Sequence, residues 1–125
     1  VLEWLEAGWS EEIVRLERLR LHGGQPYQLE RCYLRAAQFP GIVEEEKLSS
    51  LYDLFEHRYG FRVLRAEQTL EVISADEDMA KILKLRPSDP LLSIRRCSYD
   101  QKNAPLEYVE IYLNPQGRKF TMELK

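Results

Sequence analysis

The stretch IVRLERLRLHGGQPYQLERCYL, residues 13–34, decides the fold. Residues 13–22 have the composition of a strand that ends in a turn at Gly23-Gly24, and an extended pattern resumes over 26–34. The stretch therefore predicts a β-hairpin with a four-residue polar connection.

A second stretch of the chain resembles this hairpin. PLLSIRRCSYDQKNAPLEYVEIYL, residues 90–113, can be laid over EIVRLERLRLHGGQPYQLERCYL, residues 12–34, with one extra residue in its turn. Arg18 then matches Arg96, and Pro26 matches Pro105. Residues 91–100 and 105–113 predict the strands of this second hairpin. The repeat indicates a pseudo-duplicated α+β domain built on a mostly antiparallel sheet.

The rest of the chain supplies the helices and two further strands. Apolar residues at helical spacing predict a helix that ends at Gly60, and a second helix is predicted with its N-cap at Ser74 or Asp76. In chain order, the predicted elements are a loop over 38–50, a helix over 50–59, a half-buried strand over 61–73, a helix over 74–85 and a strand over 120–124.

Length and composition limit the classes of protein that fit. The 125 residues make one domain, and 44% hydrophobic with 31% charged residues is ordinary for a soluble globular protein. No apolar run approaches the roughly 20 residues needed to cross a bilayer, so no membrane partner is expected. The net charge of −3 and a pI near 5.5 argue against nucleic-acid binding by this part of the chain. Because it opens with VLEWLEAGW rather than Met, we expect a fragment of a longer protein.

Neither the cysteines nor the histidines form a recognisable metal or catalytic pattern. Cys32 and Cys97 have no metal-ligand spacing, and we expect two reduced cysteines packed as small hydrophobic residues. His22 and His57 are the only histidines, and the motifs GxSxG, GxGxxG and HExxH are absent. The sequence predicts no metal, no cofactor and no enzymatic activity.

Two arginines on the first strand are candidates for an anion site. Arg18 and Arg20 lie two residues apart, so they share one face of the strand with Val14 and Leu16. Two guanidinium groups on a partly apolar face can each bind a phosphate or carboxylate in bidentate fashion. The alternative is ordinary surface charge on a solvated sheet. In the repeat, Arg18 has a counterpart in Arg96 and could be structural, whereas Arg20 matches Ser98. Arg20 is therefore the arginine that is specific to the first hairpin.

The start of the helix over 50–59 and one acidic residue complete the candidate set. Ser49 and Ser50 can cap the helix, and the free N–H groups there also suit an anion. Tyr52 lies off the apolar face of the helix, where its hydroxyl group could meet a polar ligand. Glu107 shares its strand face with Val109 and could accept hydrogen bonds from sugar hydroxyls or pair with an arginine.

Together these stretches resemble the UTRA domain, the effector-binding domain of HutC-type regulators in the GntR superfamily. The resemblance rests on RLERLRLHGGQPYQLERCYL, LSSLYDLFEHRYG and AKILKLRPSDPLLSIRRCSYDQKNAPLEYVEIYL in this order, and it covers nearly all of residues 1–125. It implies a chorismate-lyase-like fold with an antiparallel sheet, flanking helices and a ligand cleft without catalysis. It also implies an upstream winged-helix DNA-binding domain, a homodimer, and a cytoplasmic transcriptional repressor that responds to a small-molecule effector.

The resemblance also implies roles for individual residues. In relatives that respond to sugar phosphates, an R-x-R pattern holds the phosphate, and here it is Arg18 and Arg20. An S-L-Y pattern at the helix start corresponds to Ser50 and Tyr52, and the acid of a P-[VL]-E-Y motif corresponds to Glu107.

The chain departs from these relatives after that motif. Leu113 stands where a second aromatic residue often lies, and Asn114-Pro115 follows it. The effector is therefore expected to be a small anion, either a sugar phosphate or an organic acid. Two other functions remain open, namely a dimerisation module without a ligand and a chorismate-lyase-like enzyme.

Overall fold

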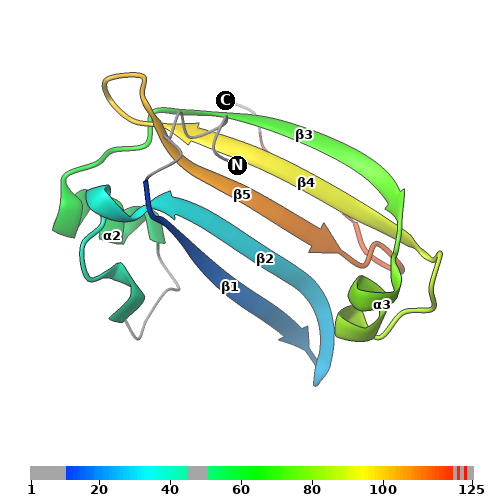
Figure 1. Cartoon of the computed structure of the whole chain (residues 1–125). Helices are drawn as coiled ribbons and strands as arrows, with labels where there is room; N and C mark the ends of the chain where they lie inside the picture. The colour runs from blue at the N-terminus through cyan, green and yellow to red at the C-terminus, as the bar shows by residue number, and fades with distance from the viewer. Residues whose placement is uncertain (1–10, 45–50, 120, 122, 124–125) are drawn as a thin grey trace.

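The computed structural model describes residues 11–44, 51–119, 121 and 123, and its central feature is one antiparallel sheet. The sheet has five strands in the order β1-β2-β5-β4-β3, so the two predicted hairpins lie side by side through β2 and β5 (Figure 1). The elements in chain order are β1 (Ile13–His22), β2 (Gln25–Arg35), η1 (Ala36–Gln38), η2 (Ile42–Glu44), α2 (Leu51–Tyr59), β3 (Arg65–Ser74), α3 (Glu77–Leu83), β4 (Pro90–Tyr99) and β5 (Pro105–Leu113).

The predicted hairpins are confirmed, and their turns explain their registers. Gly23 and Gly24 adopt φ of 57° and 78°, a left-handed conformation that glycine adopts without steric penalty. This turn places Arg18 opposite Glu30 across the hairpin, and a bulge follows directly after Arg20. In the second hairpin Ser98 lies opposite Glu107.

Two helices cover opposite ends of the sheet (Figure 1). Around α2, Phe55 packs against Phe39 with ring centroids 4.7 Å apart, and both are fully buried. Around α3, Met79 and Leu83 pack against Leu29 of β2. The helix predicted over 50–59 is confirmed from Leu51 to Tyr59 as α2, and Gly60 follows it with φ of 74°.

The second helix is shorter than predicted. Of the two proposed caps, Asp76 is the N-cap, because its Oδ1 accepts a hydrogen bond of 2.7 Å from the Met79 backbone N–H. Ser74 instead ends β3. At the other end, Lys84 adopts a left-handed conformation with φ of 53°, which stops the helix before the predicted residue 85.

Two further predictions, the loop over 38–50 and the strand over 61–73, are wrong in part. The segment over 38–50 is more than a loop, because η2 lies within it and Phe39 and Ile42 are both buried in the core. The strand predicted over 61–73 begins later, at Arg65, and it is not half-buried. Its outward position in the strand order explains this, since β3 is an edge strand whose apolar residues Leu70 and Val72 remain exposed.

Some predictions fall outside the described residues. Ser49 and Ser50 lie there, as does most of the strand predicted over 120–124; Thr121 and Glu123 are described and belong to no strand. Cys32 and Cys97 are both buried, and neither belongs to a disulfide among the described residues. No helix in the described part of the chain is long and apolar enough to cross a membrane.

Candidate functional site

A cavity of about 270 Å³ opens between α2 and the middle of the sheet. Its volume lies near the lower end of the range of about 300–1,000 Å³ seen for ligand pockets, so it suits a small metabolite. Four strands and one helix contribute to its lining, which consists of Arg18, Glu30, Leu51, Tyr52, Arg96, Glu107 and Val109. Three of the five site residues predicted from sequence, Arg18, Tyr52 and Glu107, therefore meet at one place.

The cavity has two cationic side chains on different strands. Arg18 on β1 forms an ion pair with Glu30 on β2, with Nη2 and Oε1 2.8 Å apart. Arg96 on β4 donates from Nε to Gln68 Oε1 on β3 at 2.9 Å. Each guanidinium group has five N–H donors, so the hydrogen bond to Gln68 leaves further donors of Arg96 for a ligand.

Arg20 lies outside the cavity lining. Its side chain is 46% exposed, and its Nε is 3.9 Å from Glu30 Oε2. Arg18 and Arg20 thus both approach Glu30, but only Arg18 reaches the cavity. The sequence repeat favoured Arg20, whereas the structure places the two equivalent residues Arg18 and Arg96 around the same cavity.

The acidic side of the cavity is a buried network centred on Glu107. This residue is 1% exposed, and its carboxylate accepts hydrogen bonds from the Ser98 hydroxyl and the Cys32 thiol, each at 3.1 Å. Such bonds offset the penalty of burying a carboxylate. The Tyr52 hydroxyl lies 2.9 Å from the Ser98 hydroxyl, so the network runs from α2 through β4 to β5 and β2.

Burial and the Glu107 carboxylate keep the neighbouring acids protonated. Burial, followed by the charge of Glu107, raises the pKa of the Cys32 thiol well above its ordinary value. The same two causes raise the pKa of the Tyr52 phenol. Both groups therefore remain neutral hydrogen-bond donors near neutral pH, and Cys32 serves the network as a donor rather than as a nucleophile.

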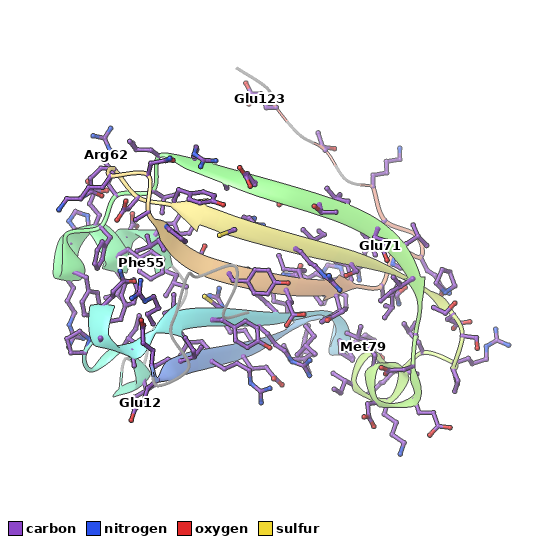
Figure 2. All side chains as sticks on the ribbon, turned by 45° about the horizontal axis from the view of Figure 1, so that its top comes forward. Glu12, Phe55, Arg62, Glu71, Met79 and Glu123 are labelled. Carbon is purple, nitrogen blue, oxygen red and sulfur yellow. The ribbon has the colours of Figure 1, made fainter. Side chains whose placement is uncertain are left out.

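The Tyr52 side chain is held in place by packing as well as by its hydroxyl. Its ring stacks on Phe55 with centroids 5.9 Å apart, and Phe55 is fully buried between α2 and the sheet (Figure 2). The helix therefore fixes one wall of the cavity while the strands supply its charged groups.

Several residues of the site were missed in the sequence analysis, among them three charged or polar ones. Arg96 could have been found from its equivalence to Arg18 in the repeat, and Glu30 from the hairpin register, which places it opposite Arg18. Nothing in the sequence indicated a role for Ser98 in the site, because a serine on a strand is common. Ser50, the fifth predicted residue, lies outside the described residues.

The arrangement suits binding more than catalysis. Guanidinium donors, carboxylate acceptors and a phenol surround a small volume. Guanidinium groups bind anions and carboxylates accept hydrogen bonds from hydroxyl groups, so the cavity suits an anion that also has hydroxyl groups. Within the described ranges, no group of three or more His, Cys, Asp or Glu residues could hold a metal ion.

These features define an α+β domain with a small polar cavity, and comparison with known proteins gives its family. The UTRA domain model matches residues 2–116, so the chain belongs to the UTRA family. The family and the relatives are transcriptional regulators of the GntR family, not enzymes.

Relatives and solved structures agree with this assignment. The chain is 25% identical over 124 residues to the probable fructoselysine utilization operon transcriptional repressor of Escherichia coli K12, covering 98% of this chain and 51% of that protein. It is 28% identical over 106 residues to the transcriptional repressor NagR of Bacillus subtilis, covering 85% and 44%. The chain thus spans about half the length of the curated relatives it matches.

Among solved structures, a GntR-family regulator from Enterococcus faecalis matches with a TM-score of 0.91 at 26% identity, covering 98% of this chain and 88% of that one. The ligand-binding domain of a GntR-family regulator from Bordetella bronchiseptica matches with a TM-score of 0.88 at 24% identity, covering 100% and 80%. The α+β fold predicted from the sequence is therefore confirmed.

Proposed function

We propose that this chain is the effector-sensing domain of a bacterial HutC-type transcriptional repressor, and that its cavity binds a small anionic metabolite. The observation that carries the proposal is the meeting of Arg18, Tyr52, Arg96 and Glu107 around one small cavity. The relatives' names support a metabolic signal, since two of them refer to fructoselysine and to mannosyl-D-glycerate.

The charges in the cavity favour a ligand of mixed character. Arg18 and Arg96 attract an anionic group, while Glu30 and Glu107 accept hydrogen bonds from hydroxyl groups. A sugar phosphate or a hydroxylated organic acid satisfies both requirements. Arg20, beside Glu30 at 3.9 Å, adds a second cation near Arg18 and stays in the proposal as a peripheral anchor.

Ser50 is proposed to complete the site from the helix start. It directly precedes Leu51 and Tyr52, which both line the cavity, and a serine at a helix N-terminus can donate to an anion. The remaining part of the regulator is proposed to be a winged-helix DNA-binding domain upstream, in a cytoplasmic homodimer. Ligand capture would then change how the paired DNA-binding domains are arranged.

The first experiment is thermal unfolding of this chain with a panel of sugar phosphates, free sugars, amino acids and organic acids. A ligand at about 100 times its dissociation constant should stabilise the domain by roughly 2.7 kcal/mol, which raises Tm by several degrees. We expect an anionic, hydroxylated compound to produce this shift. No shift with any compound would favour a dimerisation module without a ligand, and pyruvate release from chorismate would favour the lyase.

A matched pair of variants tests whether the ligand-induced rise in Tm comes from binding in the cavity. Arg96→Gln removes a cavity cation, whereas Arg95→Gln removes an exposed cation from the next position of the same strand. Because successive strand residues point to opposite faces, only Arg96→Gln should weaken the ligand-induced shift. Equal shifts in both variants would exclude Arg96 from the site.

A further inference from the structure

The four charged side chains described in the cavity lining differ in whether they have a partner of opposite charge. Arg18 and Glu30 form an ion pair with Nη2 and Oε1 2.8 Å apart. Arg96 and Glu107 also line the cavity, but neither forms an ion pair with any residue in the described part of the chain. The cavity therefore contains one cation and one anion whose charges the surrounding side chains do not compensate.

The groups that hold these two side chains are neutral. Arg96 donates from Nε to the amide oxygen of Gln68 at 2.9 Å. Glu107 accepts hydrogen bonds from the Ser98 hydroxyl and the Cys32 thiol, each at 3.1 Å. Neutral donors satisfy the lone pairs of a buried carboxylate, but they supply no positive charge. A cationic group of a ligand would therefore stabilise Glu107 more than a further hydroxyl group would.

Arg96 and Glu107 are neighbours on one face of the sheet. Arg96 on β4 lies opposite Val109 on β5, and Glu107 is two residues from Val109 on the same strand. Such diagonal neighbours are about 7–8 Å apart at Cα, which is within reach of long side chains. The Nε of Arg96 nevertheless bonds to Gln68 on β3, which lies on the other side of β4. A small ligand in the cavity can therefore contact both charges.

The Tyr52 hydroxyl group reports the same closeness. Burial and then the charge of Glu107 raise the pKa of this phenol, while hydrogen bonds with Ser98 and Arg96 lower it. Both charges thus act on one oxygen atom. Because two hydrogen bonds of ordinary length span about 6 Å at most, a ligand that contacts both charges needs its own two charges only a few bonds apart.

The sum of the charges in the lining favours a ligand without net charge. Two arginines and two glutamates are described in the lining, so their formal charges cancel. A ligand with one positive and one negative group keeps this balance. A ligand with only negative groups would pair with Arg96 and leave Glu107 without an opposite charge.

We propose that the effector is a small zwitterion of the amino acid type, whose carboxylate binds Arg96 and whose ammonium group binds Glu107. A guanidinium group can bind a carboxylate through two parallel hydrogen bonds, and an ammonium group has three donors for carboxylate oxygens. The inference rests on the proposed function, since the carboxylate is the anionic group that the cavity is proposed to bind. It adds an amine, which distinguishes this ligand from a sugar phosphate or a hydroxylated acid.

Matched compounds test the two charges of the ligand separately. Thermal unfolding of the 125-residue chain with the common L- and D-amino acids identifies the amino acid that raises Tm most. Isothermal titration calorimetry then compares that amino acid with its α-hydroxy acid, which lacks the ammonium group, and with the amine that lacks its α-carboxylate. Each analogue should bind about tenfold or more weakly, because each leaves one cavity charge without its partner.

Two variants assign the contacts to individual residues. Glu107→Gln should reduce the preference for the amino acid over the hydroxy acid to about twofold or less, because the amide has no charge. Arg96→Gln should weaken both compounds by the same factor, since both have the carboxylate. Glu110→Gln is the matched control, because Glu110 lies on the same strand as Glu107 but on the opposite face of the sheet. The Tm of each variant without ligand shows whether it is folded, and the comparison of compounds on the unsubstituted chain requires no variant.

The outcomes distinguish this inference from the proposed function. Tm shifts with sugar phosphates or hydroxy acids but with no amino acid would overturn the zwitterion and leave anion binding intact. An amino acid that binds no better than its hydroxy acid, or a preference that Glu107→Gln leaves unchanged, would also overturn it. No shift with any compound would contradict both proposals.

Discussion

Replacing Ser98 with alanine should destabilise the domain by removing one support of a buried carboxylate. The Ser98 hydroxyl is fully buried and donates to Glu107 Oε1 at 3.1 Å, while Glu107 is 1% exposed. A hydrogen bond to a charged group contributes about 1.5–3 kcal/mol. We therefore expect Ser98→Ala to lower the free energy of unfolding by about 2 kcal/mol.

Thermal unfolding followed by circular dichroism measures this loss. For a domain of this size, about 1 kcal/mol corresponds to roughly 3–5 °C, so Tm should fall by about 6–10 °C. Ser74→Ala, which removes an exposed hydroxyl at the end of β3, is the control and should leave Tm within about 2 °C.

A double-mutant cycle with Glu107→Gln identifies the cause. In the native background, Glu107→Gln removes the charge that strengthens two hydrogen bonds. In the Ser98→Ala background the same substitution relieves a poorly supported buried charge, so it should cost about 1–2 kcal/mol less. The reasoning is refuted if the two substitutions are additive or if Ser98→Ala alone leaves Tm unchanged.

Three further predictions concern the core, the helix cap and alkaline pH. Phe39→Ala should destabilise the domain by about 3–5 kcal/mol in urea unfolding, because Phe39 is buried against three aromatic rings, whereas Val43→Ala at an exposed position should have little effect. Asp76→Ala should lower the unfolding free energy by about 1 kcal/mol through loss of the 2.7 Å cap, with Asp78→Ala as a control in the same turn; equal effects would exclude the cap. Burial, followed by the charge of Glu110, raises the pKa of Tyr112 to about 12, so the native state holds this proton more tightly than the unfolded state. Stability should therefore fall as pH rises from about 10, the ordinary tyrosine value, towards 12, and Tyr112→Phe should flatten that fall in Tm against pH; identical pH profiles would contradict it.

The hairpins could be predicted from the sequence because their signals are local. Paired glycines set the first turn, and alternation sets the strand faces on either side of it. The register that this turn sets places Arg18 opposite Glu30, so the contact between them could also have been predicted. The helix α2 was equally accessible, because its apolar spacing and Gly60 lie within one short stretch.

Other features depend on contacts between distant segments. The apolar alternation of β3 is typical of a half-buried strand, but its exposure is set by its position at the sheet edge, which the alternation does not encode. The burial of Phe39 depends on rings contributed by α2 and by Phe61 after it. Arg20 shares the strand face of Arg18, yet it lies beside the bulge near the hairpin end and outside the cavity lining.

The candidate site was predictable in part for the same reasons. Arg18, Tyr52 and Glu107 were found, while Ser98 and Cys32 became visible only when the central strands were brought together. The network around Glu107 joins four elements, so no single stretch of sequence contains it.

The central claim is that a small anionic effector binds in the cavity between α2 and the sheet. The most direct measurement follows the backbone amide chemical shifts of the isotope-labelled chain during titration with the compound that raises Tm most. The account predicts saturable changes that are largest around Arg18, Tyr52, Arg96 and Glu107. Saturable changes concentrated elsewhere, for example at the hollow lined by Ala36 and Ala37, would contradict it.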